Sequence, residues 1–221
     1  MKTSYRKYFA VSVFILAVGV SIFLTIRVID KEMPIIDEWS SPAVAGINDS
    51  ILFEIFRWLT ELGSGTFLTP FSIAFGIFLW FYSKDWIAAF MLPIGTMIGY
   101  KINYWIKLFV ARERPRIFAE AEGVGFSFPS GHAMVALIAY GMVIYFLINY
   151  TKSRRVSLWI NVGGLILILL IGASRYVIRV HYLTDVVAGY AFGLIFLMIW
   201  IVVYQLLISF KSRIIYFRSP S

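Results

Sequence analysis

Long uncharged, apolar runs recur along the chain and determine its predicted architecture. A helix needs about 20 mostly apolar residues to cross the hydrocarbon core of a bilayer. The pattern therefore predicts an all-α bundle of six transmembrane helices, built by residues 1–221 as a single membrane-embedded domain. The third run contains one charge, Lys101, which we interpret as a lysine that extends to the headgroups. The six runs cover residues 8–26, 62–83, 86–106, 133–151, 156–174 and 186–210.

A shorter amphipathic segment lies between the first two runs. Asp49 or Ser50 is placed to cap a helix there. The polar residues that follow, Glu54, Arg57 and Glu61, recur at intervals of three and four and so share one helical face. The pattern predicts a short helix lying in the membrane interface. It acts either as a lid for lipid entry or as a simple tether, and the sequence slightly favours the tether.

Basic residues are distributed unequally between the two ends of the predicted helices. Because positively charged flanks stay in the cytoplasm, we expect both termini to be cytoplasmic in a multi-pass protein of the plasma membrane. The first run is longer than a signal-peptide core, so we expect it to remain as a helix. The basic residues at the expected cytoplasmic end are Lys2, Arg6, Lys7, Lys84, Lys152, Arg154, Arg155, Lys211, Arg213 and Arg218.

Several arginines at the expected outer end break this charge rule. Charges near a membrane that do not serve topology are candidates for function. We interpret Arg112, Arg116 and Arg179 as residues that steer an anionic substrate, with simple solvation as the alternative. Arg114 and Arg175 belong to clusters described below.

Composition narrows the possible chemistry. The chain is 60% hydrophobic and 14% charged, whereas an average soluble domain is about 45–50% apolar and about 25% charged. Because the chain has no cysteine, disulfides, thiolate catalysis and cysteine-ligated metal centres are excluded. The net charge of +8 is explained by the cytoplasmic flanks, so we expect a bilayer and a membrane lipid as partners and no nucleic acid. The sequence leaves the oligomeric state open.

Three clusters of chemically capable residues fall at the outer end of the predicted bundle. Topology alone brings all three to one membrane face. They are Lys107 with Arg114-Pro115, then Pro129-Ser130-Gly131-His132, and finally Ser174-Arg175 with His181 and Asp185.

These clusters offer the groups that bind phosphate. Lys107, Arg114 and Arg175 supply positive charge, and the planar fork of arginine suits phosphate oxygens. Ser130 supplies a hydroxyl, and Gly131 supplies an N–H that a phosphate can approach closely at the positive end of the following helix. Phosphoryl transfer requires such preorganised donors. With this much positive charge, we expect no metal and no cofactor.

The two histidines of the chain both lie in these clusters. His181 and Asp185 are four residues apart, so they share a face of a helical turn. Asp185 can accept a hydrogen bond from one ring nitrogen and leave the other nitrogen free to attack phosphorus. His132 is then the candidate general acid for the leaving oxygen.

Taken in order, the clusters resemble the three-part signature of the type-2 phosphatidic acid phosphatase superfamily, the lipid phosphate phosphatases. The eleven matching positions are written Lys107-x6-Arg114-Pro115, Pro129-Ser130-Gly131-His132 and Ser174-Arg175-x5-His181-x3-Asp185. The resemblance extends over residues 60–205 or so. The signature is also similar to the anion site of vanadium-dependent haloperoxidases.

The resemblance implies a phosphohistidine intermediate at His181, an acid at His132 and metal-independent turnover. It also implies six membrane helices. The distribution of basic residues, in turn, leads us to expect the active site on the extracytoplasmic face. The short chain looks most like the bacterial members. Among the family's substrates, we expect phosphatidylglycerophosphate or undecaprenyl pyrophosphate first. The alternative is that the protein is a phosphatidate phosphatase of broad specificity.

Other functional classes remain as alternatives. Six helices and intramembrane lysines would suit an anion or lipid transporter, although no pair of repeated halves is visible. The intact histidine pair argues against a lipid-binding scaffold. The strongly apolar chain argues against an enzyme that oxidises substrates with bound vanadate. Phosphate release that depends on His181 would distinguish the phosphatase from the transporter.

Overall fold

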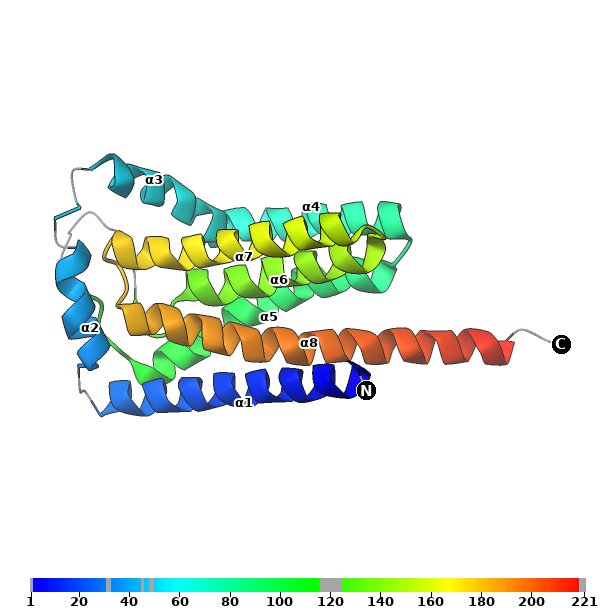
Figure 1. Cartoon of the computed structure of the whole chain (residues 1–221), viewed down its shortest axis with the longest axis horizontal. Helices are drawn as coiled ribbons and strands as arrows, with labels where there is room; N and C mark the ends of the chain where they lie inside the picture. The colour runs from blue at the N-terminus through cyan, green and yellow to red at the C-terminus, as the bar shows by residue number, and fades with distance from the viewer. Residues whose placement is uncertain (1, 31–32, 45, 48–49, 116–124, 219–221) are drawn as a thin grey trace.

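In the part of the chain that the structure describes, six long helices run side by side (Figure 1). The computed structural model describes residues 2–30, 33–44, 46–47, 50–115 and 125–218. This part of the chain contains no β-strand, so the prediction of an all-α fold is confirmed. The long helices are α1 (Lys2–Ile29), α4 (Gly65–Ser83), α5 (Trp86–Val110), α6 (Gly131–Tyr150), α7 (Arg154–Val177) and α8 (Leu183–Arg218).

Within the described residues, five helices are long and apolar enough to cross a membrane. The remaining long helix, α5, packs against α4 and α6 and contains the polar residues Lys101, Asn103 and Lys107. The multi-pass membrane character is therefore confirmed, and the sixth crossing stays a prediction. The five segments are Lys7–Ile29, Gly65–Ser83, Gly131–Tyr150, Arg154–Val177 and Leu183–Arg213.

Short helices gather at the end of the bundle opposite to both termini (Figure 1). They are α2 (Ile35–Ser40), the 3-10 turn η1 (Ser41–Val44), α3 (Ile51–Thr60) and the 3-10 turn η2 (Glu61–Gly63). The sequence predicted α3 but missed α2, because six residues are too few to display a helical period.

A serine side chain begins α3. The hydroxyl of Ser50 accepts a hydrogen bond from the N–H of Phe53 at 3.2 Å, so one of the two expected caps is in place. Helix α3 packs against α7. Its position in the membrane interface and its role as lid or tether stay predictions.

Close contact between α6 and α8 brings two of the clusters together. A Cβ atom at Gly189 would lie 2.6 Å from the carbonyl oxygen of Ser130, and one at Gly193 would lie 2.8 Å from that of Met134. Only glycine leaves room for the two backbones to approach so closely. As a result, the N–H of Ser130 can donate to the carbonyl of Asp185 at 2.9 Å, which joins the start of α6 to the start of α8.

Candidate active site

The three predicted clusters meet at the end of the bundle that carries α2 and α3. Lys107 lies in the last turn of α5, and Asp185 lies in the first turn of α8. Ser130 caps α6, where its hydroxyl accepts from the N–H of Ala133 at 3.4 Å. His181 lies in the turn between α7 and α8. The structure thus brings together residues that are up to 78 positions apart, since Lys107 and Asp185 border the same site.

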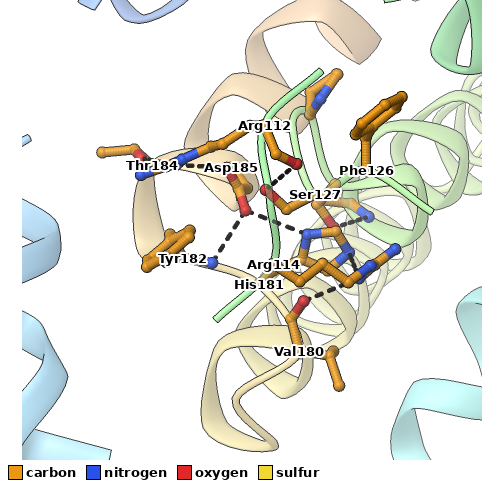
Figure 2. Close-up of polar contacts among 12 residues, drawn as sticks. Arg112, Arg114, Phe126, Ser127, Val180, His181, Tyr182, Thr184 and Asp185 are labelled. Carbon is orange, nitrogen blue, oxygen red and sulfur yellow. Dashed lines mark hydrogen bonds and ion pairs between the residues drawn. The ribbon is translucent and has the colours of Figure 1, made fainter. Parts of the chain in front are cut away.

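His181 is held from both sides of its ring (Figure 2). Its Nδ1 lies 3.3 Å from Oδ2 of Asp185, and its Nε2 lies 3.1 Å from Nη1 of Arg114. Because arginine can only donate, Nε2 is the acceptor and the ring proton is on Nδ1. This is the tautomer in which Nε2 keeps its lone pair.

The backbone of a tight turn fixes the position of His181. The N–H groups of Val180 and His181 both donate to the carbonyl of Arg175, each at 3.2 Å. Arg179 turns the chain with a left-handed φ of 60°, a conformation that a non-glycine residue rarely adopts. The turn returns the chain onto α8 with His181 directed inward, where the residue is 3% exposed.

Burial also determines the charge of His181. Burial is the main cause that lowers the pKa of His181 well below its ordinary value, and the positive charges of Arg114, Lys107 and Arg175 lower it further. The imidazole is therefore neutral near neutral pH. A neutral imidazole with a free lone pair is the nucleophilic form.

Two of the cations are held by main-chain carbonyls near His181. The ammonium group of Lys107 donates to the carbonyl oxygens of Phe126 at 2.6 Å and Ser127 at 3.0 Å. Arg114 donates from Nε to Gly125 O at 3.0 Å and from Nη1 to Val180 O at 2.8 Å. Both cations are thus fixed by the segments that carry the other clusters.

The third cation, Arg175, approaches from α7 and is 8% exposed. Its Nη1 donates to the hydroxyl of Thr60 at 3.0 Å, so the end of α3 reaches the site. Its Nε has no hydrogen-bond partner among the residues that the structure describes. A buried donor of this kind is available to an anion.

His132 lies in the first turn of α6, beneath η2. A Cβ atom at Gly63 would lie 3.2 Å from Cδ2 of His132. Arg175, His181 and Arg114 are near enough to act electrostatically on its ring. Both histidines therefore face the same group of cations.

The residues beneath the second cluster are also close together. The side chain of Asn103 in α5 donates to the carbonyl of Pro129 at 3.3 Å. A Cβ atom at Gly131 would lie 2.9 Å from Oδ1 of Asn103, so a larger residue there would displace the amide of Asn103. The first N–H groups of α6 have no partner within the helix, which suits them to an anion. In the described residues, no three His, Asp or Glu side chains converge to hold a metal ion.

The arrangement of these groups agrees with comparisons to known proteins. Residues 86–209 match the family model of the PAP2 superfamily. The chain belongs to the PAP2 superfamily. It is therefore a phosphatase of a membrane-bound family.

The PAP2 relatives include a curated bacterial enzyme and two solved structures. The chain is 34% identical to phosphatidylglycerophosphatase B of Bacillus subtilis over 162 residues, which cover 72% of this chain and 78% of that protein. The crystal structure of a transmembrane PAP2-type phosphatidylglycerolphosphate phosphatase from B. subtilis aligns with a TM-score of 0.75 and 27% identity. The alignment covers 83% of this chain and 93% of the other. LpxE of Aquifex aeolicus shares the fold, with a TM-score of 0.54 at 24% identity over 72% of this chain and 90% of that one.

A more distant relative is a fusion protein of Schizosaccharomyces pombe, the palmitoyl-protein thioesterase-dolichyl pyrophosphate phosphatase fusion 1. The identity is 32% over 108 residues, which cover 47% of this chain and 17% of the fusion protein.

The structure adds residues to the PAP2 site that the sequence did not indicate. The side chain of Arg112 is only 10% exposed and pairs with Asp185 at 2.6 Å and with Asp37 at 2.8 Å. Its interpretation as a residue that steers substrate is therefore wrong. Arg179 lines a small cavity beside His181, and Arg116 lies outside the described residues. The charge-rule violation indicated that Arg112 matters, but nothing in the sequence pointed to Asp37 or Thr60.

Proposed function

We propose that this phosphatase removes phosphate from a membrane lipid on the extracytoplasmic face, with His181 as the nucleophile. The observation that carries the proposal is the ring of His181, held between Asp185 and Arg114. Asp185 accepts from Nδ1 at 3.3 Å, and the arginine that would bind phosphate lies 3.1 Å from Nε2. A phosphate held by Arg114 would thus present its phosphorus to the lone pair of the nucleophile.

The first step transfers the phosphoryl group to the enzyme. The lone pair of His181 Nε2 forms a bond to phosphorus while the bond from phosphorus to the leaving oxygen breaks. The electron pair goes to that oxygen, which takes a proton from His132. Lys107, Arg114 and Arg175 stabilise the charge on the other phosphate oxygens. Asp185 stabilises the positive charge that develops on the imidazole.

The second step returns the enzyme to its starting state. His132, now neutral, takes a proton from a water molecule as the water oxygen attacks phosphorus. The bond between phosphorus and Nε2 breaks, its electrons return to Nε2, and inorganic phosphate leaves. The three cations provide the positive charge that a metal would otherwise supply, so we expect activity in the presence of EDTA.

The distribution of charge supports an outward-facing site. The α4–α5 and α6–α7 connections and both termini lie at the end opposite to the site (Figure 1). That end carries Lys84, Lys152, Arg154 and Arg155. Positive flanks favour the cytoplasm, and this supports an extracytoplasmic position for the site at the other end.

The relatives support a phospholipid monophosphate as the first substrate. The name of the B. subtilis relative specifies phosphatidylglycerophosphate, and the alignment covers most of both chains. A polyprenyl pyrophosphate such as undecaprenyl pyrophosphate is the second candidate, because the S. pombe relative is named for a dolichyl pyrophosphate phosphatase activity. Phosphatidate is the third.

Phosphate release from a lipid panel tests the proposal. Purified protein in detergent is given phosphatidylglycerophosphate, undecaprenyl pyrophosphate or phosphatidate with EDTA present, beside the variant His181→Gln. We expect release by the wild type and none by the variant. Labelled substrate quenched during turnover should also leave an acid-labile phosphoryl group on the wild type alone.

The outcomes separate the parts of the proposal. The ranking of kcat/KM names the preferred lipid. Release by His181→Gln at the wild-type rate would remove His181 as the nucleophile, and activity that needed added magnesium would contradict the cationic mechanism. Absence of release from every lipid would contradict the proposed substrates.

A further inference from the structure

A buried aspartate from outside the three clusters lies behind the candidate nucleophile. Asp37 belongs to α2 and is 3% exposed. Its Oδ1 accepts from the N–H of Thr184 at 2.9 Å, and its Oδ2 accepts from the hydroxyl of Thr184 at 2.6 Å. Oδ2 also accepts from Nη2 of Arg112 at 2.8 Å. A buried carboxylate is costly unless it is paired and hydrogen-bonded, and these contacts go to residues that border the site.

Arg112 joins Asp37 to Asp185. Its Nη1 donates to Oδ1 of Asp185 at 2.6 Å while its Nη2 donates to Asp37. The guanidinium carbon lies 3.9 Å from the ring centre of Tyr182. Burial acts to lower the pKa of Arg112, but the charges and hydrogen bonds of Asp185 and Asp37 outweigh burial and raise it. The planar guanidinium holds Nη1 and Nη2 in a fixed fork, so one arginine can serve both carboxylates in a defined geometry.

This contact orients the carboxylate that faces His181. Oδ1 of Asp185 is used by Arg112, so Oδ2 is directed to Nδ1 of His181 and to the N–H of Tyr182 at 3.0 Å (Figure 2). Rotation of the carboxylate would break the contact with Arg112. The orientation of the histidine ring therefore depends on Arg112.

The backbone of Arg112 supports the other side of the ring. Its carbonyl accepts from the N–H of Ser127 at 2.8 Å, and the carbonyl of Ser127 in turn accepts from Lys107. Arg114, which contacts Nε2 of His181, follows two residues later. One residue thus fixes the segment on each side of the imidazole.

We infer that Asp37 and Arg112 form a positioning pair that acts through Asp185 to hold His181 in its attacking orientation and tautomer. The inference rests on the proposed function and extends it to residues that hold the nucleophile from behind. Asp37 also shares the charge of Arg112, so the three groups together keep one negative charge. That charge favours the imidazolium that develops when Nε2 attacks phosphorus.

The first test is the variant Asp37→Asn, compared with Glu38→Gln on the same helix. Glu38 is the neighbouring acid and is exposed. We expect Asp37→Asn to lower kcat by about tenfold or more while KM changes by less than about twofold, because the pair touches the nucleophile's support and not the lipid. Glu38→Gln should retain the wild-type kcat. A loss confined to KM, or no loss, would overturn the inference.

A double-mutant cycle separates positioning from general structural support. If Asp37 acts through Asp185, then Asp37→Asn should have little further effect on kcat in an Asp185→Asn background. A structural role that is independent of Asp185 would instead produce the full loss again in that background. That additive result would overturn the inference.

A milder variant keeps the test informative if Asp37→Asn does not fold. Thr184→Val preserves side-chain shape and removes the hydroxyl that donates to Asp37 and accepts from Arg112 at 3.0 Å. We expect a fall in kcat of about threefold to tenfold with KM unchanged. An unchanged kcat in Thr184→Val would count against the pair. Absence of phosphate release by the wild type would overturn the proposed function itself, whereas an active wild type with unaffected variants would overturn this inference alone.

Discussion

Replacement of Asp185 by asparagine should remove the nucleophilic form of His181 while it preserves the shape of the site. Nη1 of Arg112 donates to Oδ1 of Asp185 at 2.6 Å. In Asp185→Asn the amide oxygen must face this donor, because arginine has no acceptor to offer. The amide nitrogen then takes the place of Oδ2, opposite the N–H of Tyr182 and Nδ1 of His181. Nδ1 must accept a hydrogen bond, so the ring proton moves to Nε2 and the lone pair needed for attack is lost.

The size of the effect follows from the contacts that change. Loss of one hydrogen bond to a charged group costs about 1.5–3 kcal/mol, which corresponds to about 10- to 150-fold in rate. The wrong tautomer adds to this loss, and the same error in a serine protease lowers kcat by about 10,000-fold. We therefore expect kcat of Asp185→Asn to fall by about 100-fold to 10,000-fold.

The assay measures initial rates of inorganic phosphate release in detergent, with thermal unfolding recorded in parallel. Asp85→Asn is a matched control at the other end of the bundle. Asp85 caps α5 and accepts from the hydroxyls of Tyr150 at 3.2 Å and Tyr204 at 2.5 Å. The control should lower the unfolding temperature and leave kcat near the wild-type value. A folded Asp185→Asn variant with kcat within about tenfold of wild type would refute the tautomer argument.

Three further predictions concern pH, packing and topology. Burial lowers the pKa of His181, and the charge of Arg114 is the next largest cause. Because protonation of His181 removes the nucleophile, kcat/KM should fall as the pH drops through this pKa. Arg114→Gln should therefore move the acidic limb of the pH profile to higher pH, and an unmoved limb would contradict the role of that charge. Gly63→Ala would place a methyl group against α7 and the second histidine, so activity should fall by about tenfold or more, whereas full activity would show that this turn can shift freely. Because the chain has no cysteine, an introduced cysteine is the only thiol in the protein that a maleimide can label. Ser41→Cys should react with an impermeant maleimide in intact cells, whereas Ser153→Cys should react only after permeabilisation. The reverse pattern would place the site in the cytoplasm.

Much of the fold could be predicted because lipid exposure leaves a direct mark on composition. Apolar runs located the long helices, and the serine before α3 located its start. The sequence also predicted that α5 crosses the membrane, and this crossing stays a prediction, since the polar residues Asn103 and Lys107 face the site and lower the hydropathy of the helix. The active site needs polar side chains on this helix, whereas the bilayer favours apolar ones.

The site could be predicted only where its residues stand in recognisable order. The spacing of four between His181 and Asp185 indicated their contact, and the structure places them 3.3 Å apart. Asp37 could not be found in this way, because it meets Arg112 across 75 positions and Thr184 across 147. Its segment is an acidic stretch in which the partnered carboxylate looks like its exposed neighbours. Only three-dimensional packing distinguishes them.

The contacts of α2 and α3 have a consequence for how this enzyme can be divided or recombined. The family match begins at residue 86, yet Asp37 and Thr60 reach the site from the preceding segment. A fragment trimmed to the matched region would leave Arg112 and Arg175 without these partners. The first 63 residues are therefore not an exchangeable anchor, and a chimera between relatives should take α2, α3 and the segments that carry Arg112 and Arg175 from the same parent.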